Sequence, residues 1–198
     1  PVQLVGHSLG GAVAVRSALA HPDRVASLTL VEPVLFNLLE ETEDSTAGEH
    51  LQLTETMTAL IGVGNLEGAA RVFLEAWGAP GGLDGMDART RAYVVRTIVR
   101  VVADWFGLSC SAPGALTTAD LGAVASPTLL LCGERSRPSM HRIVALLRAA
   151  LPQVEYQEIL TAGHMSPITH HAMVNGIIIE FLRRRISGLS ARPCTTGR

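Results

Sequence analysis

The feature that most constrains the fold of this chain is a Gly-His-Ser-Leu-Gly-Gly segment at residues 6–11, which separates a stretch typical of a strand from one typical of a helix. Residues 2–5 form a short apolar run typical of a buried strand. Residues 12–20 are rich in alanine, which favours a helix, until Pro22 ends it. The pattern predicts a strand, a tight turn that carries Ser8, and a helix.

Further apolar runs of strand length occur at residues 25–31, 127–132 and 154–160. Helical patterns follow the later two runs, at residues 140–151 and 168–186. Strands that alternate with helices indicate an α/β fold with a parallel sheet and flanking helices.

Residues 34–108 differ in character, because apolar residues there recur at helical spacing between glycine-rich and acidic segments. We interpret this stretch as a helical cap inserted into a core made of residues 1–33 and 109–186. Within it we expect Trp77, Trp105 and Phe106 to be packing residues rather than substrate contacts. Residues 187–198 are polar and predict a disordered tail.

The chain begins at Pro1 directly inside a strand pattern, so we expect it to start within a fold. Its 198 residues are 47% hydrophobic, which is enough to bury one sizeable core. A net charge of −2 argues against a nucleic-acid surface and favours a small neutral or apolar substrate.

Neither a membrane-spanning run nor a leader pattern is visible, so we predict a soluble, cytoplasmic protein. The three cysteines lack metal-ligand spacing, so we predict reduced thiols at Cys110, Cys132 and Cys194. The sequence implies no metal and no cofactor, and it leaves the oligomeric state open.

A serine hydroxyl is a weak nucleophile, so an enzyme that uses one must expose it, pair it with a base and supply donors to the oxyanion. The Gly-x-Ser-x-Gly pattern between a strand and a helix serves this purpose. This segment resembles the nucleophile elbow of the α/β-hydrolase family. The resemblance implies Ser8 as the nucleophile and the backbone N–H of Leu9 as an oxyanion donor.

His164 follows the last strand run in an Ala-Gly-His-Met loop. Loops at the carboxyl ends of parallel strands gather at one edge of a sheet, where Ser8 should also lie. The resemblance places the catalytic base in this loop, in the family's order of serine, acid and histidine. Of the other histidines, His7 lies inside the turn, where we expect it to line or support the site.

The acid is where the chain departs from the family pattern. The commonest arrangement has an aspartate in the loop after residues 127–132, where this chain has Ser136. We favour Glu32, which ends the second strand run, as some family branches have their acid there. The alternatives are Glu134 in the usual loop and, less favoured, two aspartates elsewhere: Asp104 and Asp120.

The resemblance covers the second half of a hydrolase domain, so we expect a partial α/β-hydrolase fold without the earlier strands or the second oxyanion donor. It implies a serine hydrolase that cleaves an ester or related acyl bond of a small hydrophobic substrate through an acyl-serine intermediate. A ligand-binding protein or receptor with little turnover, and an acyltransferase, are the alternative functions. Because of the missing half, an isolated fragment is expected to be nearly inactive.

Overall fold

The computed structural model describes residues 1–109, 111–112 and 114–190. Its centre is a four-stranded sheet in the order β1-β2-β3-β4, and every neighbouring pair is parallel. The strands are β1 (Val2–His7), β2 (Val25–Val31), β3 (Thr128–Gly133) and β4 (Val154–Ile159). The parallel α/β fold class predicted from the sequence is therefore confirmed.

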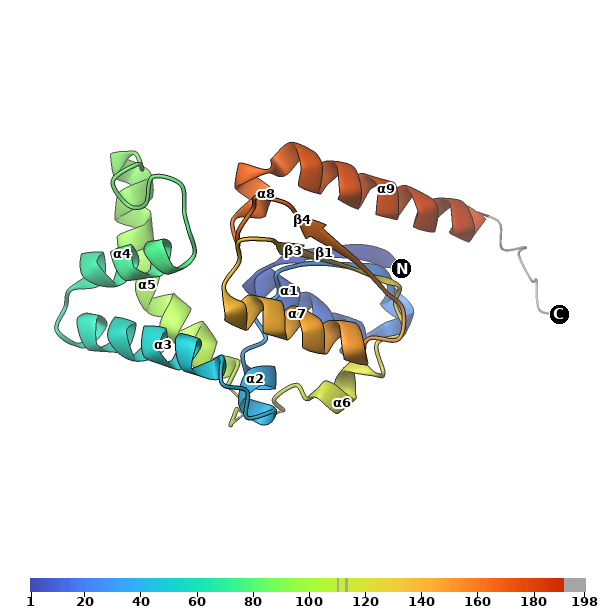
Figure 1. Ribbon diagram of the computed structural model, residues 1–198, viewed down its shortest axis with the longest axis horizontal. Helices are drawn as coiled ribbons and strands as arrows, with labels where there is room; N and C mark the ends of the chain where they lie inside the picture. The colour runs from blue at the N-terminus through green and yellow to red at the C-terminus, as the bar shows by residue number, and fades with distance from the viewer. Residues whose placement is uncertain (110, 113, 191–198) are drawn as a thin grey trace.

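Helices cover both faces of this sheet, as parallel sheets require. Helices α1 (Leu9–Ala20) and α7 (Pro138–Ala150) lie against one face, and α9 (His171–Ser190) lies against the other (Figure 1). Successive side chains of a strand point to opposite faces, so Leu130 packs in the larger core with α1 and α7, while Leu131 packs with α9.

The segment interpreted as an insertion is helical. It contains α2 (Asn37–Glu41), α3 (Ala47–Gly62), α4 (Leu66–Ala76) and α5 (Ala88–Gly107). The last three pack on one another beside the sheet, away from α9 (Figure 1). The chain returns to the core through α6 (Thr118–Leu121). That these helices act as a cap stays a prediction.

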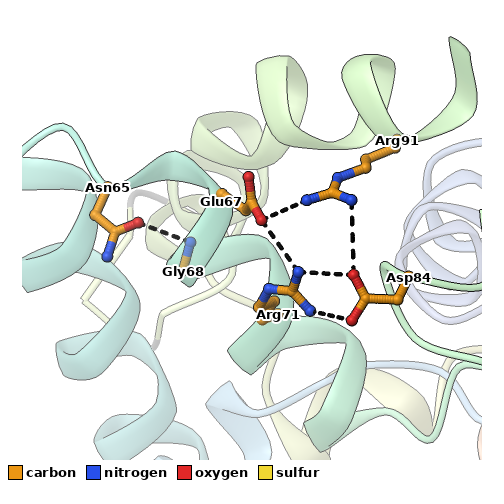
Figure 2. A network of polar contacts seen from close by, with 6 residues as sticks. All are labelled: Asn65, Glu67, Gly68, Arg71, Asp84 and Arg91. Atoms are coloured by element: carbon orange, nitrogen blue, oxygen red, sulfur yellow. Dashed lines mark hydrogen bonds and ion pairs between the residues drawn. The ribbon is translucent and has the colours of Figure 1, made fainter. Parts of the chain in front are cut away.

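Ion pairs fix the loop between α4 and α5, as Figure 2 shows. The Arg71 guanidinium donates to both carboxylate oxygens of Asp84 at 2.6 and 2.7 Å, and to Glu67 at 3.1 Å. Arg91 reaches the same Glu67 oxygen at 2.5 Å. At the start of α4, the Asn65 side chain accepts from the N–H of Gly68 at 2.9 Å (Figure 2). These side chains are exposed to solvent, which screens their charges, so the network orders the loop more than it stabilises the fold.

Charged side chains also join the insertion to the core. Glu49 on α3 accepts hydrogen bonds from Ser139 Oγ at 2.9 Å and from Arg137 Nε at 3.2 Å, at the start of α7. Oδ2 of Asp44, which lies between α2 and α3, is 2.5 Å from Nε of Arg142 on α7. The insertion is thereby held against the end of the core that carries the β3–α7 loop.

Three details differ from the sequence-based predictions. Phe106 is 62% exposed rather than packed, because it lies on the solvent side of α5. The last helical region is split into α8 (Ser166–Thr169) and α9, and α9 continues to Ser190, past the predicted start of the tail. Each further residue adds a backbone hydrogen bond, so a helix can extend beyond its apolar face.

Of the predicted thiols, Cys132 is a buried free cysteine, whereas Cys110 and Cys194 lie outside the described residues, as does the tail from residue 191 onward. Across the described ranges, no helix combines the length and the apolar character needed to cross a membrane.

Candidate active site

Ser8 occupies the turn between the end of β1 and the start of α1. Its backbone has φ 56° and ψ −124°, in a region that residues with a side chain rarely adopt. Its N–H donates to the carbonyl oxygen of Val31 at 3.0 Å, and its own carbonyl accepts from Val34 at 3.2 Å. The strained turn is thus fixed to the end of β2, and such strain commonly accompanies functional sites.

Two glycines make this turn possible. A Cβ on Gly6 would lie 2.3 Å from the carbonyl oxygen of Gly10, and a Cβ on Gly11 would lie 2.7 Å from Cβ of Pro33. A Cβ on Gly10 would meet nothing within 4 Å among the described atoms. The close approach of α1 to its neighbours therefore depends on Gly6 and Gly11, while Gly10 has open space.

His164 lies in the loop after β4 and faces the serine. Its Nε2 is 3.0 Å from Ser8 Oγ, and its Nδ1 is 2.9 Å from Oε2 of Glu32. The imidazole is only 7% exposed. The carboxyl ends of β1, β2 and β4 bring these three residues to one edge of the sheet, although they are far apart in the sequence.

Glu32 directly follows β2 and is fully buried. Its second oxygen, Oε1, accepts from the N–H of Gly133 at 2.7 Å and from the hydroxyl of Ser136. Burial alone would raise the pKa of Glu32, but the hydrogen bonds from His164 and Ser136, the charge of His164 and the Gly133 N–H outweigh it. The pKa therefore lies below its ordinary value, and the carboxylate is ionised.

The other acidic candidates have different surroundings. Glu134 is exposed and accepts from the backbone N–H of Thr161 at 2.7 Å. Asp120 forms a capping box with Thr117 at the start of α6. Asp104 is exposed on α5, where it lines a pocket beside Ser8. Of the four candidates, the structure brings Glu32 to His164.

Two aromatic rings lie against the His164 imidazole. The Nε2–H of His7 donates to the His164 carbonyl oxygen at 2.9 Å, and the two ring centroids are 4.8 Å apart. Burial, and then the nearby His164, lower the pKa of His7, so its ring is neutral. The indole of Trp77, at the end of α4, lies 4.3 Å from His164 between centroids. These contacts restrict the orientation of the imidazole.

A small pocket of about 90 Å³ opens beside Ser8 and Leu9. Its walls are mainly apolar and aromatic, and they come largely from the helical insertion: Val34, Phe73, Trp77, Val101, Asp104 and Trp105. Trp77 and Trp105 are each 6% exposed, so both are packed as predicted, but both also line this pocket, whereas the sequence-based prediction set them apart from substrate contacts. Their place in the pocket wall was not predicted, because it depends on how α4 and α5 pack.

Leu9 is the first residue of α1, where a backbone N–H has no acceptor within the helix. Its amide is therefore available to a negatively charged oxygen beside Ser8. Among the described residues, no group of three or more His, Cys, Asp or Glu side chains is arranged to hold a metal ion.

The fold is that of a known class. The family model for the α/β-hydrolase fold matches residues 1–171, so the chain belongs to the α/β-hydrolase fold family. The RutD protein of Yersinia enterocolitica, whose name describes it as a carbamate hydrolase, is 26% identical over 186 residues. The lipase LipV of Mycobacterium tuberculosis is 57% identical over 35 residues, which is 18% of this chain and 13% of LipV.

Among solved structures, a hydrolase from Pseudomonas aeruginosa superimposes with a TM-score of 0.70 at 23% identity, covering 91% of this chain and 64% of that one. The alignment with RutD covers 90% of this chain and 62% of RutD. The chain thus spans less than two thirds of these relatives, and the structural likeness shows the fold alone.

Proposed function

We propose that this chain carries the catalytic residues of a serine hydrolase, with Ser8 as nucleophile, His164 as base and Glu32 as the acid that orients it. The substrate proposed is an ester, or a related acyl compound, with a small hydrophobic group. The observation that carries the proposal is the continuous set of hydrogen bonds from Glu32 Oε2 through His164 to Ser8 Oγ, with distances of 2.9 and 3.0 Å.

The first half of the reaction forms an acyl-enzyme. Ser8 Oγ attacks the substrate carbonyl carbon while its proton passes to Nε2 of His164. The oxyanion that forms accepts a hydrogen bond from the N–H of Leu9, and a missing donor of this kind costs about 10²–10³-fold in rate. The carbon–oxygen bond to the leaving alcohol then breaks, and the alcohol takes the proton from His164.

In the second half, water attacks the acyl carbon and gives a proton to His164, which returns it to Ser8 as the acid is released. Ionised Glu32 accepts from Nδ1–H throughout, which keeps Nε2 available as the base and stabilises the imidazolium. His7, neutral and bonded to the His164 backbone, supports the loop without competing for the proton.

The choice of an acyl bond with a small hydrophobic group rests on the pocket. Its volume of about 90 Å³ and its aromatic walls suit a short apolar acyl chain.

As part of the proposal, the helical insertion at residues 34–108 is a cap over the core formed by residues 1–33 and 109–186. The name of RutD favours a carbamate as a second bond type for the same machinery. The cytoplasmic location also stays a prediction.

A fluorophosphonate probe tests the proposal directly on the full-length protein. We expect covalent labelling at Ser8, located by peptide mapping, and its loss in His164→Ala. Ser17→Ala, which removes another α1 hydroxyl that donates to the Val13 carbonyl within the same helix, is the matched control and should label like the wild type. A folded protein that fails to label at Ser8 would exclude nucleophilic catalysis by this residue.

A further inference from the structure

The loop after β3 has a serine where the family resemblance places an acid. The Ser136 side chain is nearly buried, with 9% exposure, and its hydroxyl donates to Oε1 of Glu32. We propose that Ser136 is a positioning residue that holds the Glu32 carboxylate so that Oε2 faces His164. This inference rests on the proposed function and assigns a part in it to the β3–α7 loop.

The two oxygens of Glu32 have separate partners. Oε1 accepts from Ser136 and from the Gly133 N–H, whereas Oε2 accepts from His164. The terminal torsion of a glutamate is broad and roughly two-fold, so burial alone does not fix the plane of the carboxylate. Two donors on Oε1, both from the end of β3 and the loop after it, fix that plane and leave Oε2 directed at the imidazole.

The hydroxyl also suits the charge at this point. An ionised carboxylate only accepts hydrogen bonds, so Ser136 must be the donor. An aspartate at position 136 would instead bring a second negative charge against Glu32, which would raise the pKa of one of the two carboxyl groups. A serine in the usual acid position is therefore compatible with an acid after β2.

A donor series at position 136 tests the role in the full-length protein. Ser136→Thr keeps the hydroxyl, Ser136→Cys keeps the size with a weak donor, and Ser136→Ala removes the donor. We expect kcat on a short-chain ester to fall in that order, by about tenfold for alanine. The cysteine variant carries the test if the alanine variant does not fold.

The pH profile separates positioning from a general loss of stability. The acid limb of kcat/KM against pH reports proton uptake by the coupled Glu32–His164 pair. Without the Ser136 donor the pKa of Glu32 rises and the pair takes up a proton more readily, so this limb should move to higher pH. The other titratable groups that act on Glu32 are His164, His7 and the buried thiol of Cys132, whose pKa burial raises to about 12. None of these is altered in the series.

Ser139→Ala is the matched control. Ser139 lies three residues after Ser136, and its buried hydroxyl donates to a different carboxylate, that of Glu49. This substitution should lower stability and leave the acid limb unchanged. Wild-type labelling at Ser8 with identical kcat and acid limb across the series would overturn the positioning role and leave the proposed function intact. Failure of the folded wild type to label would overturn the proposed function itself.

Discussion

The Nδ1 atom of His164 lies 2.9 Å from Oε2 of Glu32, a carboxylate that follows β2 rather than β3. In the sheet order, β2 lies between β1, which leads to Ser8, and β3, which leads to Ser136. A side chain at the end of β2 can therefore reach the same edge as one at the end of β3. The backbone of Glu32, with φ 44°, turns the chain there so that the carboxylate points into the core instead of toward solvent.

We expect Glu32→Gln to lower kcat by about 10³–10⁴-fold, because an amide cannot stabilise the imidazolium or hold the required tautomer. Steady-state hydrolysis of a short-chain ester by the full-length protein measures this. Glu134→Gln is the control, since it alters an exposed carboxylate bonded to Thr161, and it should stay within about twofold of the wild type. A larger loss in Glu134→Gln than in Glu32→Gln would reverse the assignment.

The pKa of Glu32 also makes a prediction about stability. Because this pKa is lower in the folded protein than its ordinary value of 4.5, the ionised carboxylate stabilises the folded state above that pH. The contribution is lost as the pH falls below 4.5 and through the lower folded pKa. Urea unfolding from pH 7 to pH 3 should show a decline in the free energy of unfolding that is shallower in Glu32→Gln. If the free energy of unfolding falls equally with pH in the wild type and in Glu32→Gln, the stabilisation by ionised Glu32 is contradicted.

Local sequence patterns predicted most of the fold. The run at residues 25–31 is strand β2 with the same bounds, and the turn around Ser8 was predicted from its glycines and the alanines that follow. These features depend on neighbours in the chain, so their signal is local. Phe106 was placed wrongly because the apolar pattern of α5 marks which residues are apolar, not which side of the helix faces solvent.

The candidate site was less predictable from the sequence. Glu32 could be favoured over Glu134 only through the family resemblance, since each follows a strand and the sequence does not say where its side chain points. The contact of Trp77 with His164 depends on how α4 lies against the core, and no local pattern encodes this. From the sequence, Ser136 was noted only because it stands where the family has an aspartate. Its hydrogen bond to Glu32 was not predicted, because the two residues are distant in the chain.

The glycines of the nucleophile turn differ in what they require. Gly11→Ala would place a Cβ 2.7 Å from Pro33, so α1 must move, and we expect a loss of about 1–3 kcal/mol in the free energy of unfolding. Gly10→Ala meets open space on the first turn of the same helix and should be neutral or stabilise by up to about 1 kcal/mol. Urea unfolding measures both variants, and equal losses would show that the close approach of Gly11 is unimportant.

Trp77 connects the helical insertion to the proposed base, because its indole contacts His164 and forms part of the wall beside Ser8. Trp77→Ala should enlarge the pocket, so we expect the preferred acyl chain in a series of nitrophenyl esters to become longer. The loss of the indole from the His164 imidazole should also lower kcat. Phe106→Ala removes an exposed aromatic from the same insertion and should leave both the chain-length preference and kcat unchanged.

The cost to stability must be measured beside the kinetics, since truncating a buried tryptophan costs about 3–5 kcal/mol. Thermal unfolding of each variant identifies the temperature range in which Trp77→Ala is still folded, and the ester series is compared within that range. If the folded variant keeps the wild-type chain-length preference, the pocket beside Ser8 does not select the acyl group. In that case the specificity must come from residues other than this aromatic wall.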